Sequence, residues 1–473
     1  MTTPLTACVI GGGVAGLSAA VFLDSLGYRV TLLERKNILG GRTFSFQDPK
    51  TRMTVDNGQH LLMGAYHETL RFVENIGATR HLQVQQKTEV PLISSQGVYS
   101  SLKESQLPHP FGMGMGLARL KHLSWKDKFY FLKLARHLQA SKIPPPSHIV
   151  GVGANDYSPL QKNTGDLEIN FQNLSVREWL YSWSQSKKAQ ENFWEILTLA
   201  TLNEKTNVAP ATLLETVLQK GLLGKGQDSK LIFPKAPLSE VFAHPAQTYL
   251  TLRGHSLRLQ TKVKVIHILD SRVQAVELDS GEKIKADLYF SAVPPRSLLN
   301  MIPEGFHKIP YFESLKQFRC SPIVSINLWF DREIFKDRFI GLGGKTLHWI
   351  FNKNKIHDIP QSPYQYVGVI SAAYDLLEKS REEIVKIVLQ EILELFPKAV
   401  SVNLLHSLVN KEREATLSID PTIEKLRPDQ RSPFSNFYVI GDWTNTGLPA
   451  TIESAVVSAR RAVDFINSKN TCP

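Results

Sequence analysis

The chain has 473 residues, of which 42% are hydrophobic and 21% are charged, and its net charge is +11. That length exceeds what one compact core usually holds, so we expect two domains. No uninterrupted apolar run reaches the roughly 18 residues of a membrane span, so we expect no membrane-spanning helix. The positive charge suits an anionic membrane surface or nucleic acid. No helix-turn-helix, zinc-finger or RNP-like pattern supports nucleic acid, and we expect no such partner.

The three cysteines, Cys8, Cys320 and Cys472, form neither a Cys-x-x-Cys pair nor a metal-ligand pattern, so no metal site is predicted. A sparse, odd set of cysteines is typical of a reducing cytoplasm. The apolar N-terminus lacks the basic region of a signal peptide. We therefore expect a cytoplasmic protein.

The first 34 residues predict a βαβ unit, with strands at 6–10 and 28–33 around a helix. Gly11, Gly13 and Gly16 stand between the first strand and the helix in the pattern Gly-x-Gly-x-x-Gly. Gly11 makes the tight turn, Gly13 lets the backbone approach a pyrophosphate, and Gly16 lets the helix pack close to the strand. The pyrophosphate would lie at the positive end of the helix, against the turn that includes Val14 and Ala15.

A ribose-binding acid follows at Glu34, which lies 23 residues after Gly11. The next segment, Leu39-Gly40-Gly41-Arg42, is a loop in which Arg42 offers a fork of donors to pyrophosphate oxygens. An NAD-binding fold is the simpler alternative, but this loop favours FAD. Because Cys472 lies on a polar C-terminal tail, we expect FAD to be bound non-covalently.

A basic amphipathic stretch at 117–142 is the most unusual feature of the middle of the chain. Leucines and aromatic residues alternate there with seven basic residues, against Asp127 alone. Such a stretch is typical of helices that lie on a bilayer, and the alternative is a helix packed on its own protein with a solvated basic face. We expect peripheral contact with the inner face of the plasma membrane.

Hydrophobic patterning predicts a mostly helical region after residue 85, a polar surface loop at 144–173, and helices again at 176–223. Strand patterns occupy 247–292, 322–330 and 366–372, with an amphipathic helix at 380–395. We predict a discontinuous FAD-binding domain from 1–85, 240–297 and 416–467. The segments 86–239 and 298–415 would then form an inserted α+β substrate domain.

The C-terminus carries the second half of the cofactor site. Asp442 follows a buried strand, where a carboxylate can accept hydrogen bonds from ribityl hydroxyls. A helix is predicted to start near Thr451, and its N-terminal amides would stabilise negative charge on the reduced flavin ring. Since the two halves lie more than 400 residues apart, both ends of the chain are expected to hold one FAD.

Two blocks, Asp56-Asn57-Gly58-Gln59-His60-Leu61-Leu62-Met63-Gly64-Ala65-Tyr66 and 441–453, make the whole chain resemble the flavin amine oxidase and phytoene desaturase superfamily, and more closely the hydroxysqualene dehydroxylase family. Residues 199–203 and 231–234 resemble weaker family blocks. The resemblance implies an α/β fold with a Rossmann-like, glutathione-reductase-type FAD domain. It also implies that hydride from reduced flavin converts hydroxysqualene, a C30 isoprenoid, to squalene with loss of water.

Site residues follow from the motifs and the resemblance. We expect FAD to contact Gly11, Gly13, Val14, Ala15, Gly16, Glu34, Arg35, Gly41, Arg42, Gly58, Gln59, Val263, Gly441, Asp442, Thr451 and Ile452. His60 is the candidate general acid, and its alternative role is a structural histidine bonded to a carbonyl. Asn203 and Asn445 are candidates to position the hydroxyl, or else turn and cap residues. Glu453 is expected to be a capping carboxylate.

Other functions stay open on the sequence alone. An amine oxidase is disfavoured. Members of that class resemble one another in a lysine near flavin N5, within a strand like 321–325, and in this chain Pro322 occupies the corresponding place. A carotenoid-type desaturase or isomerase shares the fold and apolar substrates, and a non-catalytic lipid-binding flavoprotein belongs to a different class. The resemblance further implies prenyl-synthase enzymes that supply hydroxysqualene, and the sequence identifies no electron donor.

Overall fold

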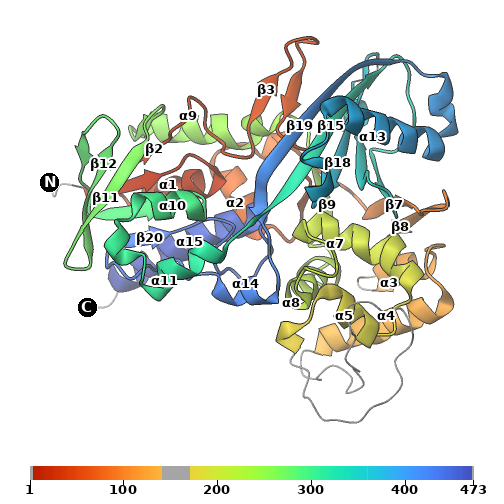
Figure 1. The fold of residues 1–473 in the computed structure, drawn as a ribbon, viewed down its shortest axis with the longest axis horizontal. Coiled ribbons are helices and arrows are strands. Elements are labelled where there is room, and N and C mark those ends of the chain that lie inside the picture. The colour runs from red at the N-terminus through yellow and green to blue at the C-terminus, as the bar shows by residue number, and fades with distance from the viewer. Residues whose placement is uncertain (1–3, 108, 110, 141–170, 360, 471–473) are drawn as a thin grey trace.

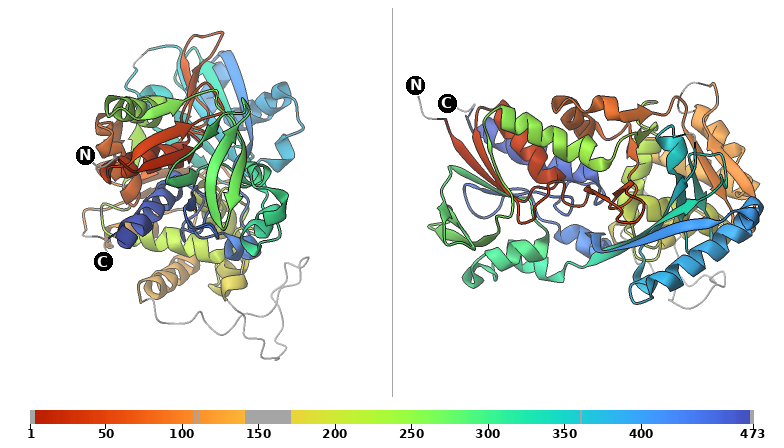
Figure 2. Two further views of the ribbon diagram at one scale, coloured as in Figure 1. Left: turned by 90° about the vertical axis from the view of Figure 1, so that its left-hand side faces the viewer. Right: turned by 90° about the horizontal axis from the view of Figure 1, so that it is seen from above.

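The computed structural model describes residues 4–107, 109, 111–140, 171–359 and 361–470. A five-stranded parallel sheet lies at one end of its long axis and a seven-stranded sheet at the other (Figures 1 and 2). Among the helices in those ranges, none is long and apolar enough to cross a membrane. The two sheets thus separate the nucleotide-binding end from the rest of the molecule.

The parallel sheet has the order β10-β2-β1-β14-β20. Its strands are β10 (Ser256–Arg258), β2 (Arg29–Leu33), β1 (Thr6–Ile10), β14 (Leu288–Ser291) and β20 (Phe437–Val439). Because side chains alternate along a strand, Ala7 and Val9 of β1 pack on one core and Cys8 and Ile10 on another. Both faces of the sheet are therefore buried, as expected for parallel strands.

The first core is covered by helices from opposite ends of the chain. Helix α1 (Val14–Ser25) packs along α15 (Ile452–Asn470), and α9 (His244–Leu252) lies beside α1 (Figure 1). Gly16 is needed for the approach of α1 to β1, because a Cβ there would lie 1.9 Å from the carbonyl oxygen of Gly11. The predicted βαβ unit is confirmed.

The predicted strand region from residue 247 begins later than expected. Residues up to Leu252 belong to α9, since Ala246 and Leu250, four residues apart, are buried against the core with α1. Strands resume with β10, and an antiparallel sheet of β11 (Val263–Leu269), β12 (Arg272–Leu278) and β13 (Lys283–Ile284) then covers the second core. Within 263–278 the strand prediction is confirmed.

The seven-stranded sheet has the order β19-β15-β18-β17-β16-β7-β8. Its strands are β19 (Leu404–Leu417), β15 (Cys320–Phe330), β18 (Tyr364–Ser371), β17 (Trp349–Asn352), β16 (Phe339–Leu342), β7 (Glu89–Ile93) and β8 (Tyr99–Lys103). Helix α13 (Arg381–Leu395) packs on one face, and its capping box at Ser380 and Glu383 confirms the predicted start. The other face carries a separate apolar cluster.

The hairpin of β7 and β8 corrects the prediction of a mostly helical region after residue 85. β7 pairs with β16 in parallel, with Leu92 beside Gly341, so its position depends on a contact between segments about 250 residues apart in sequence. Pro91 within the run also weakens its strand pattern. Local periodicity could not identify this pairing.

A helical layer completes the molecule below the seven-stranded sheet (Figure 1). It contains α3 (Phe111–Ala118), α4 (Trp125–Ala140), α5 (Val176–Ser182), α7 (Glu195–Leu202) and α8 (Ala211–Val217), which confirms the helical prediction for 176–223. Of the predicted polar loop, only 171–173 lie within the described residues, and they form a short 3-10 turn.

The predicted domain boundaries remain a prediction. A small sheet joins β5 (Leu62–Met63) and β6 (Leu82–Val84) of the 1–85 segment to β9 (Leu231–Pro234) of the 86–239 segment. This pairing brings the block that follows Asp56 next to the proposed substrate segments.

Candidate active site

The start of α1 is an open anion site. The Gly13 cap contributes no side chain, the first turn holds no acidic residue, and the first intrahelical bond runs from Leu17 N to Gly13 O. The amides of the first turn therefore have no acceptor within the helix. Together with the positive end of the helix dipole, they suit a pyrophosphate.

Two glycines leave room beside this site. A Cβ built on Gly13 would come no closer than 3.8 Å to another residue, at Gly41 Cα, and one built on Gly58 would meet nothing within 4 Å. Neither residue has the positive φ that would itself demand glycine. The space at both positions is what a cofactor lying against the backbone would need.

Glu34 occupies the expected ribose position at the end of β2. Its carboxylate accepts hydrogen bonds from Gly12 N at 2.7 Å and Lys36 N at 2.8 Å, and it is 8% exposed. Its carbonyl accepts from Thr261 N, which places the start of β11 and the buried Val263 nearby. Arg35 is exposed, and no contact between its side chain and Glu34 is found among the described residues.

Arg42 and Asp442 lie together although 400 residues separate them. Arg42 Nη2 donates to Asp442 Oδ1 at 2.6 Å, and Arg42 Nη1 donates to the carbonyl of Ala415 in β19. The sequence assigned these groups to different parts of FAD, and the structure pairs them with each other. The pair uses one carboxylate oxygen of Asp442, and no hydrogen bond to the second oxygen is found among the described residues, so its contact with ribityl hydroxyls stays a prediction.

A buried arginine that sequence reasoning missed holds the C-terminal loop. Arg427 Nη2 donates to the carbonyls of Asp442 (3.1 Å) and Thr444 (2.6 Å), and its Nη1 donates to Leu448 O (2.8 Å) and pairs with Glu424 (2.9 Å). No motif marks this residue, because most of its partners are backbone oxygens.

The predicted helix start is confirmed. Helix α15 begins at Ile452, and Thr451 Oγ1 accepts from Ser454 N at 3.3 Å. At the start of the loop that leads from β20 to α15, Gly441 has φ +143°, and a Cβ there would lie 2.8 Å from Trp443 Nε1. Gly441 thus lets the chain turn between β20 and Asp442.

The segment 56–60 is held by a buried lysine that directly follows β17 of the seven-stranded sheet. Lys353, which is 7% exposed, donates to Gln59 Oε1 at 3.0 Å and pairs with Asp56 Oδ2 at 3.4 Å. Asn57 is held from the other side, where Asn410 Nδ2 donates to its carbonyl at 2.7 Å. These contacts fix the block that carries Gly58 and His60.

His60 lies half-buried in this network. Burial lowers the pKa of His60 to about 4. The carboxylate of Asp56 opposes this shift, whereas the cations Arg42 and Lys353 add to it. No hydrogen bond to its ring is found among the described residues, so the alternative of a histidine bonded to a carbonyl is not seen there. At neutral pH the ring is uncharged, with both nitrogens available to a ligand.

The other candidate catalytic residues lie in different settings. Asn203 ends α7 with φ +50°, and its amide donates to Ser321 O and Thr416 Oγ1 and accepts from Ala372 N. Asn203 is thus the C-cap of α7, and its side chain links β15, β19 and the residue that follows β18. Asn445 is exposed on the C-terminal loop. Their catalytic roles remain predictions that no contact supports.

Glu453 is a capping carboxylate, but for a neighbouring helix. It accepts hydrogen bonds from the amides of Glu68 (3.0 Å) and Thr69 (2.9 Å) in the first turn of α2 (His67–Asn75). Because the acid stabilises the positive end of α2, it fixes the orientation of α15 against the 56–66 block.

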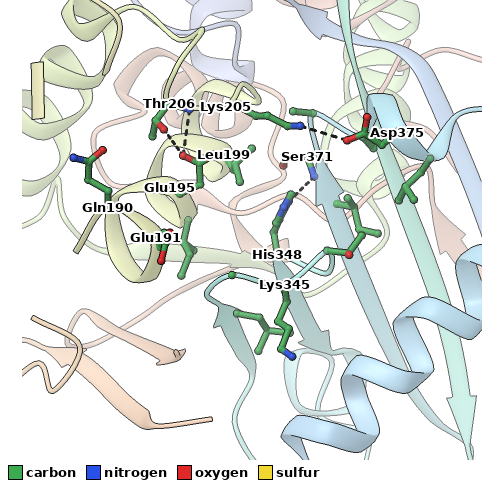
Figure 3. Close-up of a pocket in the computed structure, with 18 of the residues that line it drawn as sticks. Gln190, Glu191, Glu195, Leu199, Lys205, Thr206, Lys345, His348, Ser371 and Asp375 are labelled. Carbon is green, nitrogen blue, oxygen red and sulfur yellow. Dashed lines mark hydrogen bonds and ion pairs between the residues drawn. The ribbon is translucent and has the colours of Figure 1, made fainter. Parts of the chain in front are cut away.

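A pocket of about 600 Å³ opens between the helical layer and the seven-stranded sheet. Glu195, Lys205 and Thr206 face His348, Ser371 and Asp375 across it, with Lys205 paired to Asp375 at 3.4 Å (Figure 3). None of the predicted cofactor or catalytic residues lines this pocket, although Asn203 bonds to Ala372 at its wall. The pocket is therefore separate from the cofactor groups described above.

The chain matches the family of flavin containing amine oxidoreductases over residues 14–467 and belongs to that family. It is 28% identical to hydroxysqualene dehydroxylase of Sinorhizobium fredii (strain NBRC 101917 / NGR234), over 98% of this chain and 99% of that protein. It is 24% identical to the chloroplastic/chromoplastic 15-cis-phytoene desaturase of Solanum lycopersicum, over 98% of this chain and 78% of that protein. A solved oxidoreductase from Methanosarcina mazei has a TM-score of 0.74 at 15% identity and covers 97% of this chain and 100% of its own.

These similarities confirm the predicted fold and cofactor. The protein is an FAD-dependent oxidoreductase. The residues fit FAD: the uncapped start of α1 suits the pyrophosphate, Glu34 the ribose, and the open backbone at Gly13 and Gly58 the approach of the cofactor. The individual contacts, and non-covalent attachment, remain predictions.

Proposed function

We propose that the protein reduces hydroxysqualene to squalene with loss of water. The observation that carries this proposal is the end-to-end similarity to hydroxysqualene dehydroxylase, which spans 98% of this chain and 99% of that protein. Hydroxysqualene is a lipophilic C30 isoprenoid, so the partner expected from the sequence is a long apolar molecule with one hydroxyl.

An apolar wall next to the 56–66 block supports a hydrocarbon substrate. Leu61 and Met63 pack against a buried cluster on one face of the seven-stranded sheet. The cluster comprises Leu231, Phe233, Phe339, Phe351, Ile356 and Val367. Since the six residues are packed against one another, a hydrocarbon chain would contact the partly buried Leu61 and Met63, through dispersion and exclusion of water.

The polar groups beside that wall support loss of a hydroxyl. Reduced FAD supplies the hydride for the carbinol carbon. As the carbon–oxygen bond breaks, the departing hydroxide needs a proton to leave as water. In this proposal the ammonium of Lys353, whose pKa is lowered by burial, donates that proton, and neutral His60 hydrogen-bonds the hydroxyl.

A carotenoid-type desaturase or isomerase is the second candidate, supported by the 24% identity to phytoene desaturase over nearly the whole chain. Amine oxidation is disfavoured by Pro322, which lies buried in β15 where a lysine was expected for that chemistry. A non-catalytic lipid carrier would not need the predicted FAD-binding residues at both ends of the chain for flavin chemistry. A supply of substrate from prenyl-synthase enzymes and a cytoplasmic location are part of the proposal.

The proposal is tested by mixing the purified protein anaerobically with chemically reduced FAD and hydroxysqualene, followed by mass spectrometry. We expect squalene to form in step with reoxidation of the flavin. If enzyme that demonstrably holds reduced FAD yields no squalene, the dehydroxylase proposal fails. Oxidised enzyme would then be incubated with polyenes, where new double bonds or isomers would support the second candidate.

A further inference from the structure

Helix α4 exposes three large apolar side chains on one face. Trp125 is 80% exposed, Phe129 54% and Leu132 50%. Their spacing of four and three residues places them in a row along the helix. Exposed apolar residues are common singly, whereas a row of three bulky ones points to a binding surface.

The opposite face of α4 is firmly packed, so the exposed row is not a displaced part of the core. Phe131, Leu134 and Leu138 are buried, and the ring of Phe131 stacks on Trp194 with centroids 5.2 Å apart. Helix α3, which packs against α4, adds Phe111 at 71% exposure and Met115 at 39%. Helices α3 and α4 thus both leave apolar side chains in water.

The charges around the row are of one sign. The basic residues between 119 and 136 are Arg119, Lys121, Lys126, Lys128, Lys133 and Arg136. None of them forms an ion pair with any residue that the structure describes. The one acid, Asp127, is 2% exposed because it accepts hydrogen bonds from Ser124 N (3.0 Å) and Ser186 N (2.9 Å). Its carboxylate is therefore not presented on the exposed face of α4.

The lysines lie beside the exposed aromatic rings. Lys128 Nζ is 4.8 Å from the ring centre of Trp125, and Lys133 Nζ is 4.7 Å from that of Phe129. Long basic side chains can keep their ammonium groups at lipid headgroups while their stems and the rings enter the apolar layer. This arrangement favours a lipid surface over a protein partner, because lysines are depleted in protein–protein interfaces.

We propose that the α4 face, formed by Trp125, Phe129 and Leu132 with the surrounding lysines, binds the surface of an anionic lipid bilayer. The helix would lie in the plane of the interface with its apolar row inserted and its cations at the headgroups. This inference does not depend on the reaction proposed above, because vesicle binding needs neither substrate nor turnover.

Flotation of the FAD-loaded protein with vesicles tests the proposal. We expect binding to vesicles of equal phosphatidylcholine and phosphatidylglycerol and little binding to phosphatidylcholine alone, with affinity falling as salt is added. Replacing Lys126, Lys128 and Lys133 by Gln should lower the partition coefficient about 100-fold, at roughly five-fold per cation. The double variant Trp125→Ala/Phe129→Ala should lower it by about ten-fold or more.

A matched control is Leu252→Ala, which removes a side chain that is 81% exposed on α9 and should leave binding unchanged. The variant Trp125→Phe should keep binding but reduce fluorescence quenching by brominated acyl chains, which locates residue 125 in the lipid. Each variant is compared for melting temperature and flavin absorbance to confirm folding. Equal vesicle binding by the wild type and the double variant would overturn the proposal. The proposal would also fail if the wild type bound no vesicles but self-associated on sedimentation, and the double variant did not.

Discussion

His60 illustrates how one side chain's surroundings determine its protonation state. Because the ring is uncharged above its pKa of about 4, it can orient a hydroxyl at neutral pH but is not an imidazolium. We expect His60→Ala to lower kcat about 100-fold while flavin absorbance is retained. The imidazolium donates a stronger hydrogen bond to the departing hydroxyl than the neutral ring does, so wild-type kcat/KM should be flat above pH 5 and rise as the pH approaches 4.

The control for His60 is His244→Ala, an exposed residue paired with Glu240 on the surface. It should change neither turnover nor the pH profile. An inflection near pH 6.5 in the wild type that disappears in His60→Ala would show that the ring is ordinarily hydrated. Unchanged turnover in that variant would remove His60 from the mechanism.

At the scale of elements, the loop between β20 and α15 depends on Arg427 rather than on its own sequence. Its guanidinium is fully buried, and removing it leaves Glu424 and several loop carbonyls without their donor. We expect Arg427→Ala to lower the free energy of unfolding by about 3 to 5 kcal/mol. FAD affinity should fall as well, because Asp442 and Thr451 lie in or next to this loop.

Urea unfolding and the fluorescence of released FAD measure these two effects. Arg427→Lys should recover only part of the loss, since an ammonium cannot reach all the carbonyls that the planar fork reaches. The matched control is Arg431→Ala, whose exposed pair with Asp429 at 2.9 Å should contribute less than about 1 kcal/mol. Normal stability and FAD affinity in Arg427→Ala would show that the loop holds itself.

For the whole molecule, FAD is expected to join segments from both ends of the chain. The Arg42–Asp442 pair and the packing of α1 on α15 already bring these ends together. Removing FAD should lower stability by about 4 kcal/mol relative to protein in FAD at 1,000 times its dissociation constant. Calorimetry of apoprotein titrated with FAD checks this, and a melting temperature independent of FAD concentration would contradict it.

Local patterns were sufficient where the structure depends on neighbouring residues. The strand pattern at 263–278, the amphipathic pattern at 380–395 and the glycines at 11–16 each determine an element through contacts within a few residues or one turn. They failed at β7 and at 247–252. There the outcome depends on a partner strand or helix far along the chain, which periodicity does not report.

By itself the sequence determined that the chain forms an FAD-binding α/β fold with its two cofactor motifs at the ends, because glycine spacing and carboxylate position are set by backbone geometry. Only the tertiary structure decided that Lys353 anchors Asp56 and Gln59, that Arg427 holds the C-terminal loop, and that Glu453 caps α2. These residues act on groups distant in sequence or on backbone atoms. Such partners leave no pattern of residue types, so they become visible only when folding brings them into contact.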